Sequence, residues 1–414
     1  MFNNLFYHQD SYITMEYQRK NEYDLTLETF HSLREKIKTI EGKIKSKTCF
    51  LGFDGYIDSI YSLVKSRSGP KQWNPMKKME TFGEIIKEVA GSAANIERVL
   101  KRRTSGGFAP NTAKAMNTLG ININLVVALG YPKIMDLFTP LTNKKSVKTI
   151  SFSDPGETLG LEFNNGKLLM PDFSNVVNIN WNLLIERIEL DYLVSLMKDS
   201  DLMGFGHWTS LPYFNEIWEH MLEEIFPKLP NLQERLFFVD LGDIRKRNRK
   251  DKNKMLQILQ KIDDEIPVVL SLNDQEAIEI SKILENVAPI DPTKPNYSDY
   301  FEGGKRINQE LNLSYLVIHS PHFATISLKN SEHYWITQGY TSEPHFTTGA
   351  GEYFHSGTLI GLSCCVRPEE AILMGNSLTG IFVRTGKAPN LNQLTNYIEN
   401  YMAFIEHDRA EFPL

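Results

Sequence analysis

The 414-residue chain has little of what marks several classes of protein. Its cysteines are too few and too scattered for a disulfide framework or a cysteine-based zinc site (Cys49, Cys364 and Cys365). No apolar run approaches the roughly 18 residues of a membrane helix, and the N-terminal residues lack the apolar core of a signal peptide. These absences predict a protein of a reducing compartment, the cytoplasm, with no membrane partner.

The chain also lacks the charge pattern of a nucleic-acid-binding protein. Its formal net charge is −6, and acidic and basic residues are interspersed, so no nucleic-acid partner is indicated. Two basic stretches, 101–103 and 245–254, are best explained as solvated segments, although the arginines of the second are also candidates for a phosphate contact. No G-x-G-x-x-G follows an early strand, which argues against a dehydrogenase that binds a dinucleotide.

Apolar and amphipathic segments alternate along most of the chain. Residues 24–45 carry apolar side chains at helical spacing and predict an N-terminal helical extension over residues 1–45. Beyond it, amphipathic stretches alternate with the compact apolar runs CFLGF, LVVALG, SDLMGFG, LFFVDLG, VVLSLN and YLVIHS. This alternation predicts an α/β fold with a parallel sheet, helices on both faces, and ligands beyond the carboxyl ends of the strands.

Two segments, 59–106 and 147–172, interrupt this alternation. The second contains the turn signal NNG between alternating runs, which is typical of a β-hairpin. We expect the two segments to form one small β-rich lid, inserted into a main domain that spans residues 46–414.

Two polar clusters near predicted early strands are candidates for a polyol site. In LGFDGYIDSI, Asp54 and Asp58 leave a strand, and two carboxylates there can accept hydrogen bonds from vicinal hydroxyls. In SGGFAPNTAKAMNTLGI, Gly106 and Gly107 permit close approach of the backbone to a ligand, and Asn111 offers a donor and an acceptor. Turn-capping aspartates, and a glycine hinge before a helix, explain the same residues equally well.

Two further clusters lie at predicted strand ends in the middle of the chain. FFVDLGDIRKR places Asp240 and Asp243 at such an end, with arginines just beyond. In LSLNDQEA, Asn273 and Glu276 share a face if a helix begins there, and their side chains could hold the hydration shell of Mg²⁺. Taken alone, this second cluster is better interpreted as a helix N-cap with its capping-box acid.

The segment TTGAGEYFHSG joins a glycine-rich turn to an apolar helical pattern. If a helix begins near Ala350, the N–H groups of Gly349, Ala350 and Gly351 point out of its N-terminus without intrahelical partners. Such donors stabilise negative charge on a transferring phosphoryl group, and Glu352 can accept the proton of an attacking hydroxyl. The pattern therefore indicates a phosphoryl-transfer site, which needs little else beyond positioning and a metal ion.

This last segment resembles the C-terminal signature of the PfkB/ribokinase family of carbohydrate kinases, D-T-x-G-A-G-D followed by an apolar helix. SGGFAPNTAKAMNTLG with LVVALG is similar to the family's N-terminal signature, and GFDGYIDSI to the end of its first strand. FVDLGDIRKR and LSLNDQEA are similar to its mid-chain strand ends, the second with the N-x-x-E motif linked to Mg²⁺. Order and spacing agree over roughly residues 46–400, and a PfkB-like subgroup with F-D-G-x-x-D also shares the HWTSLPYFNEIW segment.

The resemblance implies a ribokinase-like three-layer α/β/α sandwich with a small β-rich lid. It implies transfer of a phosphoryl group from ATP to a hydroxyl of a sugar, sugar acid or nucleoside, with Glu352 as general base and residues 349–351 as anion hole. It further implies that the sugar-like acceptor contacts Asp54, Asp58, Gly106, Gly107 and Asn111. The nucleotide is expected to contact Asn273, Thr348, Gly349, Gly351 and Asn376. Mg²⁺ is expected to be held by Glu276 and Asn273 through water. By family analogy, two lids pair into a homodimer.

Three positions depart from the family pattern. Glu352 stands where the family has aspartate, so its carboxylate is displaced by about an ångström, which can cost on the order of 100-fold in rate. Phe346 replaces the acid before the Thr pair, and IHSPHFATI, which aligns with the nucleotide segment, has no glycine. His319 and His322 there are better explained as structural histidines than as nucleotide contacts. The alternatives are a kinase with another donor, such as ADP, and a catalytically impaired relative that binds sugar or nucleotide.

Overall fold

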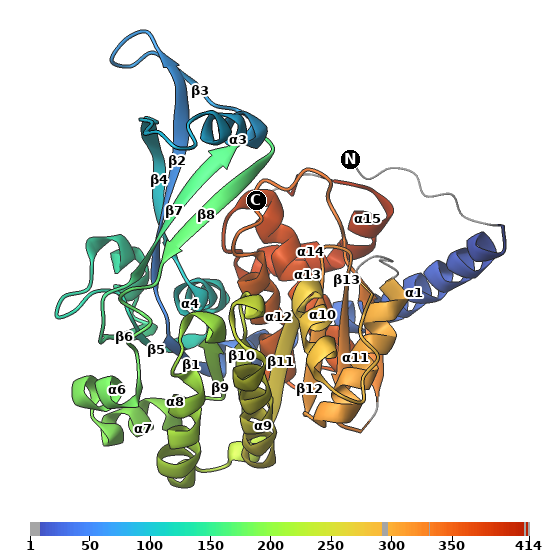
Figure 1. Ribbon diagram of the computed structural model, residues 1–414. Helices are drawn as coiled ribbons and strands as arrows, with labels where there is room; N and C mark the ends of the chain where they lie inside the picture. Colours follow the sequence, from blue (N-terminus) through green and yellow to red (C-terminus); the bar gives the residue numbers. More distant parts are fainter. Residues whose placement is uncertain (1–8, 292–296, 331, 410, 413–414) are drawn as a thin grey trace.

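The computed structural model describes residues 9–291, 297–330, 332–409 and 411–412, with the backbone alone over 9–20. Within these residues the larger sheet has nine strands in the order β14-β13-β12-β11-β10-β9-β1-β5-β6 (Figure 1). Neighbours pair in parallel except at β12–β13 and β13–β14. The strands are β1 Thr48–Phe53, β5 Asn122–Val127, β6 Val147–Ser151, β9 Leu202–Gly206, β10 Leu236–Asp240, β11 Val268–Asn273, β12 Tyr315–His319, β13 Phe323–Leu328 and β14 His333–Thr337.

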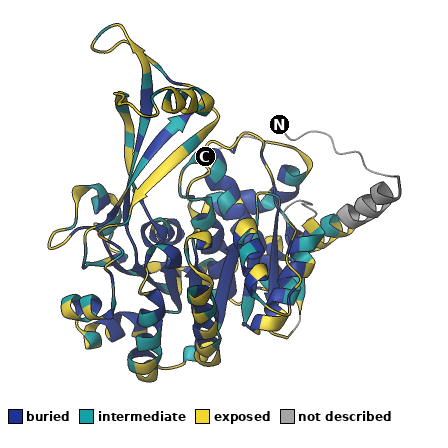
Figure 2. Ribbon diagram, in the orientation of Figure 1, coloured by how far each residue is buried: buried dark blue, intermediate teal, exposed yellow. Residues whose placement is uncertain are grey.

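The central parallel strands are buried on both faces. Successive residues of a strand point to opposite faces of a sheet, so Phe237 and Val239 of β10 join one apolar core while Leu236 and Phe238 join the other. Figure 2 shows this burial through the centre of the molecule. A strand of this kind appears in the sequence as a continuous apolar run, and all the runs predicted as strands lie in this sheet.

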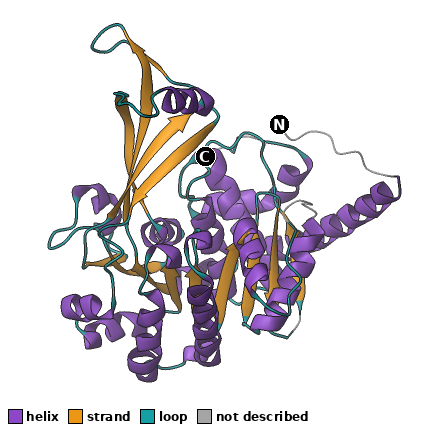
Figure 3. Ribbon diagram, in the orientation of Figure 1, coloured by secondary structure: helices purple, strands orange, loops and turns teal. Residues whose placement is uncertain are grey.

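Helices cover both faces of the sheet (Figure 3), which confirms the predicted three-layer sandwich. The layer on the Phe237 face consists of α6 Trp181–Ile188, α7 Leu190–Lys198, α8 Phe214–His220, α9 Arg249–Glu265, α10 Asp274–Ile283 and α11 Tyr297–Leu311. The opposite layer consists of α1 Gln9–Lys36, α2 Glu41–Ser46, α4 Phe108–Thr118, α5 Thr139–Thr142, α12 Ala350–Ser363, α13 Pro368–Thr385, α14 Leu391–Glu399 and α15 Tyr401–Glu406. Across the part of the chain that the structure describes, none of these helices is long and apolar enough to span a membrane.

The N-terminal extension packs onto the second helical layer. The helical pattern predicted over 24–45 is divided between α1 and α2, and Ile37 and Ile40 in the intervening turn are buried. The ammonium of Lys36 lies 2.7 Å from the carboxylate of Glu370 on α13, and Ser32 donates to the same oxygen at 2.6 Å. The extension from Thr26 to the end of α2 is therefore integral to the sandwich.

A second, smaller sheet forms the predicted lid, which rises from the carboxyl end of the large sheet (Figure 1). The predicted hairpin is confirmed, because Phe163 pairs with Gly166 across a two-residue loop. One expected lid segment, 147–151, lies instead in the large sheet, where it pairs in parallel with β5 as the edge strand β6. The lid consists of β2 Tyr56–Arg67, β3 Trp73–Pro75, α3 Met79–Glu88, β4 Arg98–Gly106, β7 Gly156–Phe163 and β8 Gly166–Asp172.

The order of the large sheet reverses at β1. The chain proceeds from β1 to β5 and β6 on one side, and from β9 to β10, β11 and β12 on the other. In open α/β sheets a crevice forms at such a switch point, beyond the carboxyl ends of the strands, and ligands bind there. The topology therefore predicts a site between the ends of β1 and β9.

Candidate active site

Polar side chains follow the central strands at this switch point. Asp54 comes directly after β1, His207 directly after β9, and Asp240 is the last residue of β10. Because β9 lies between β1 and β10, the histidine stands between two carboxylates, and its Nδ1 is 3.2 Å from Oδ2 of Asp54. The sheet thus brings together groups that lie far apart in the sequence.

Asp54 is fully buried and caps helix α4. Its Oδ2 accepts a hydrogen bond from the N–H of Phe108 and its Oδ1 one from the N–H of Ala109, both at 2.8 Å. Gly107, just before the helix, has a φ of +101°, and a Cβ there would lie 3.0 Å from the Asp54 carboxylate. Glycine permits both the backbone conformation and the close approach. Helix capping therefore accounts for both oxygens of Asp54.

Asp58 faces a different space from Asp54. It lies on β2, and the absence of a side chain at Gly106 leaves room for its carboxylate. Burial raises the pKa of the Asp58 carboxyl, while a hydrogen bond from Thr158 and the charge of His207 oppose this rise. Asp58 and Asn111 line one cavity beneath the lid.

Helix α12 begins at Ala350, as the sequence predicts, after Gly349 in the left-handed conformation with a φ of +95°. The N–H of Ala350 donates a hydrogen bond to the carbonyl oxygen of Thr347, at 3.3 Å. Glu352 lies in the first turn, and its Oε1 accepts a hydrogen bond from Nδ2 of Asn111 on α4 at 3.1 Å. This contact joins two of the sequence motifs directly.

Three cavities meet at the start of α12. The outer cavity has a volume of about 460 Å³ and includes Thr347, Ala350 and Gly351. The polar cavity, of about 300 Å³, shares Gly351 with it and is lined by Glu352. The lid cavity, of about 240 Å³, shares Thr347 with the outer cavity and includes Gly349. The predicted anion hole therefore borders all three spaces.

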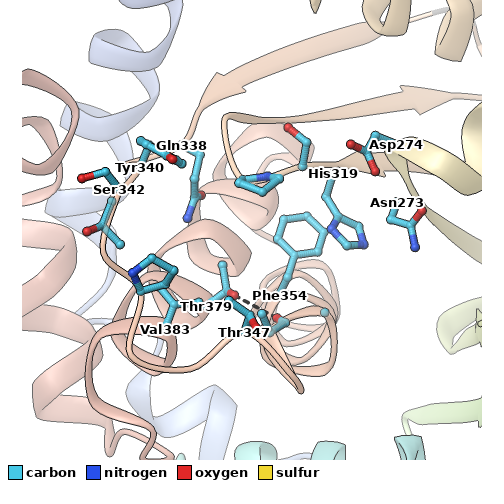
Figure 4. Close-up of a pocket in the computed structure, with 17 residues that line it drawn as sticks. Asn273, Asp274, His319, Gln338, Tyr340, Ser342, Thr347, Phe354, Thr379 and Val383 are labelled. Carbon is cyan, nitrogen blue, oxygen red and sulfur yellow. Dashed lines mark hydrogen bonds between the residues drawn. The ribbon is translucent and has the colours of Figure 1, made fainter. Parts of the chain in front are cut away.

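The outer cavity has mostly uncharged walls. In Figure 4, Gln338, Tyr340 and Ser342 line one side, and Asn273, Asp274 and His319 line another. Phe354, Thr347 and Thr379 lie between these two sides. A large, mainly apolar space with a few polar groups is typical of a site for an organic ligand.

The polar cavity is rich in carboxylates. It is lined by Asp240, Asp243, Glu276, Glu279 and Glu352, together with Arg245 and three histidines. Burial raises the pKa of Glu276, and the charge of Asp240 raises it further. Burial also raises the pKa of Glu352. The charge of His207 opposes this rise, and the charge of Asp240 adds to it.

Two histidines that line the polar cavity differ in protonation state. Burial lowers the pKa of His207, but the charges of Asp240, Asp54 and Glu352 outweigh burial and raise the pKa to about 10. His355 of α12 places its Nδ1 3.3 Å from Asp240 and its Nε2 3.2 Å from Nε2 of His319. Burial and the neighbouring His355 lower the pKa of His319 to about 3. His207 is therefore an imidazolium and His319 neutral at pH 7.

Asn273 and Glu276 form a complete capping box at the start of α10. Oδ1 of Asn273 accepts from the Glu276 N–H, and Oε2 of Glu276 accepts from the Asn273 N–H, both at 2.9 Å. The capping interpretation is thus confirmed, while both residues also line the polar cavity. Among the described residues, no three or more His, Cys, Asp or Glu side chains are grouped to hold a metal ion directly.

Three predicted nucleotide contacts lie away from the outer cavity. Asn376 is 1% exposed, and its side-chain amide donates to the hydroxyl of Tyr401 at 3.0 Å. Thr348 and Gly349 line the lid cavity. None of the three borders the outer cavity, where Asn273 and Gly351 lie.

Most of the chain matches a known family. A sequence profile described as prokaryotic ketohexokinase matches residues 25–401. The chain belongs to the prokaryotic ketohexokinase family. A ketohexokinase of Haloferax volcanii is 25% identical to it over 387 residues, which are 92% of this chain and 98% of the relative.

Solved structures related to this ketohexokinase-family chain show the same fold. The structure of Arabidopsis thaliana ribokinase complexed with ribose and ATP matches with a TM-score of 0.59 at 12% identity, over 85% of this chain and 98% of that one. The adenosine kinase of Sinorhizobium meliloti matches with a TM-score of 0.57 at 15% identity, over 86% and 99%. The family match and this shared fold confirm the predicted relationship to PfkB/ribokinase kinases.

The sequence interpretation missed the histidines of the site. His207 and His355 entered it only as letters of the segments HWTSLPYFNEIW and TTGAGEYFHSG, and His319 as a structural histidine. One signal was available, because His207 follows an apolar run directly, as Asp54 does. The sequence of this ketohexokinase-family chain does not show, however, that those two runs become neighbouring strands.

The capping role of Asp54 predicts a large effect on stability. Asp54→Ala removes two buried acceptors and leaves the charge of His207 without its partner, so we expect a loss of about 3 kcal/mol or more in the free energy of unfolding. Asp58→Ala, on the neighbouring strand, should cost less than about 1 kcal/mol, because burial already disfavours its charge. Urea denaturation of the two variants measures both values, and equal small losses would contradict the capping role.

Proposed function

We propose that the protein transfers a phosphoryl group from ATP to a hydroxyl of a ketohexose or a closely related sugar. The observation that carries the proposal is the position of Glu352. Its carboxylate is held by Asn111 in the first turn of α12, where the outer, polar and lid cavities meet. The ketohexokinase of Haloferax volcanii supports the choice of sugar.

Glu352 is suited to act as the general base of this reaction. Burial raises the pKa of its carboxyl, which makes the carboxylate a better proton acceptor at neutral pH. It would take the proton of the sugar hydroxyl while that oxygen bonds to the γ-phosphorus and the bond from this phosphorus to the leaving ADP oxygen breaks. The N–H groups of Gly349 and Gly351, at the positive end of α12, would stabilise the phosphoryl oxygens. The N–H of Ala350 donates to the carbonyl oxygen of Thr347 and would exchange this hydrogen bond for one to the phosphoryl group.

We place the sugar in the lid cavity and the nucleotide in the outer cavity. Asp58 and Asn111 offer hydrogen-bonding groups for sugar hydroxyls on the lid side. Tyr340 and Phe354 give the outer cavity aromatic surface for a nucleobase. Asp54 is assigned to the scaffold rather than to the sugar, because its oxygens already accept backbone hydrogen bonds. ADP is the alternative donor for the same cavity.

The residues of the polar cavity fit Mg²⁺ held through water. Glu276 and Asn273 line it, and the raised pKa of Glu276 reflects buried carboxylate charge that a divalent cation would balance. Mg²⁺ commonly keeps several waters and binds one or two carboxylates together with phosphates of the substrate. When bound, it would supply positive charge beside the phosphates of the nucleotide.

Substitution of Glu352 tests the proposed base. Glu352→Gln should lower kcat by about 100- to 10,000-fold, because the amide cannot accept the proton. Glu352→Asp should lower it by about 100-fold, because the carboxylate moves back from the acceptor. The measurement is release of the spent nucleotide with D-fructose and other ketohexoses: ADP when ATP is the donor, and AMP when ADP is the donor.

Glu219→Gln, on α8, is the control for this pair of variants, since Glu219 lies outside the three cavities and should leave kcat unchanged. A native protein that binds sugar or nucleotide but never turns over, while Glu352→Asp does, would refute the proposed activity. It would then identify the chain as an impaired binding protein.

Glu276→Gln separates the metal role of this residue from its capping role. Glutamine can still accept the N–H of Asn273 in a capping box, so the apo variant should keep the stability of the native protein within about 1 kcal/mol. Mg²⁺ with ATP should raise the melting temperature of the native protein through binding, and the variant should lose most of the increase that depends on Mg²⁺. An equal Mg²⁺-dependent increase in both proteins would contradict the assignment.

The lid offers a surface for the homodimer implied by family analogy. Strand β8 is at the edge of the lid sheet, and Leu168, Leu169 and Met170 are 37%, 44% and 43% exposed. An apolar edge strand of this kind favours pairing with a second chain. We expect light scattering to show a dimer that Leu169→Lys converts to a monomer, whereas Ile86→Lys on α3 does not. A native monomer at micromolar concentration would refute this pairing.

A further inference from the structure

The polar cavity contains a positively charged side chain, His207, that has no role in the reaction proposed above. His207 lines the same cavity as Glu352, with its Nδ1 3.2 Å from Asp54. Its ring packs edge-on against Phe108, with 6.2 Å between ring centroids, and a Cβ added at Gly242 would lie 3.2 Å from its own Cβ. The imidazole is thus fixed between two strand ends, beside the proposed base.

The other basic groups that line this cavity are neutral or already paired. Arg245 forms hydrogen bonds with the carboxylate of Asp243, at 2.7 and 3.0 Å. His319 is neutral because it is buried beside His355. His355 is paired with Asp240, with its Nδ1 3.3 Å from Oδ2. Among the described residues lining the polar cavity, His207 is the one whose positive charge acts on Glu352.

We infer that His207, held by Asp54, is a positioning residue for phosphoryl transfer: its positive charge keeps the buried Glu352 ionised and able to take a proton. This inference rests on the proposed kinase function. Burial and the neighbouring Asp240 both favour the protonated carboxyl, which cannot act as a base. The charge of His207, at the end of β9 and next to the strand that carries Asp240, opposes both effects.

Charged and polar groups from every surrounding element enter this balance. Glu352 receives the charge of His207 and of Asp240 and a hydrogen bond from Asn111 of α4. His207 in turn acts on Asp54 after β1, Asp240 of β10, Asp58 of the lid and Glu276 of α10. The imidazolium therefore lies among carboxylates from four elements besides α12.

The test is the pH profile of kcat/KM for native protein, His207→Gln and His207→Lys. Loss of the cation should raise the pKa of Glu352, so the acid limb in His207→Gln should move to higher pH by on the order of one unit. His207→Lys retains a positive charge and should return the limb towards its native position. His220→Gln is the matched control, because His220 pairs with Glu224 at 2.7 Å on the sheet's helical layer and lines none of the three cavities.

An acid limb at the same pH in native protein and His207→Gln would overturn the inference. So would an equal loss of activity in the Gln and Lys variants at every pH, which would indicate a structural role. Absence of sugar-dependent turnover in native protein is a different result and counts against the proposed function. In that case ¹³C titration of the Glu352 carboxyl, assigned with Glu352→Gln, still decides, since its pKa must rise in His207→Gln.

The inference can also be tested without a variant of His207. If His207→Gln does not fold, ring ¹⁵N shifts of the native protein report protonation directly. A histidine that remains an imidazolium at pH 8, well above the ordinary range of about 6.5, supports the inference. Neutral rings for all histidines at that pH would overturn it.

Discussion

The site depends on the capping of α4 by the carboxylate of Asp54. That carboxylate accepts the first N–H groups of α4 and lies 3.2 Å from the ring of His207. It therefore joins the end of β1, the end of β9 and the start of a helix. One turn along, α4 carries Asn111, whose amide donates to Glu352. A continuous series of contacts thus runs from the buried sheet to the proposed base. The position of Glu352 therefore depends on the capping of α4 by Asp54.

Much of the fold could be predicted because its local signals are strong. Parallel strands buried on both faces give short apolar runs, and the two-residue turn of the lid hairpin and the glycine turn before α12 have clear signatures. The strands β13 and β14 were not predicted, although β13 begins within the segment compared with the family's nucleotide loop. The polar Thr325 and Ser327 interrupt β13, and β14 has only five residues, so neither gives the continuous apolar run of the central strands.

The site was predicted less completely, because its electrostatics arise from tertiary contacts. The sequence identified Asp54, Asn111 and Glu352 as chemically important, but it could not choose between a cap and a sugar contact for Asp54. That choice depends on which N–H groups reach the carboxylate. His207 depends on the adjacency of β1 and β9, and Asn376 on the packing of Tyr401 against α13. None of these contacts leaves a pattern in one sequence.

The extra methylene of Glu352, compared with aspartate, is explained by the contact of its carboxylate with α4. Its Oε1 meets the Asn111 amide at 3.1 Å across the gap between α12 and α4. An aspartate on the same backbone would end about 1.5 Å short, one carbon–carbon bond, and would lose that hydrogen bond. Phe346, which stands where the family has an acid, packs over Gly386, and a Cβ at Gly386 would collide with the phenylalanine ring. Phe346 lines the lid cavity together with Asn111 and Gly349, so both departures lie beside the start of α12, where Asn111 of α4 holds the carboxylate of Glu352.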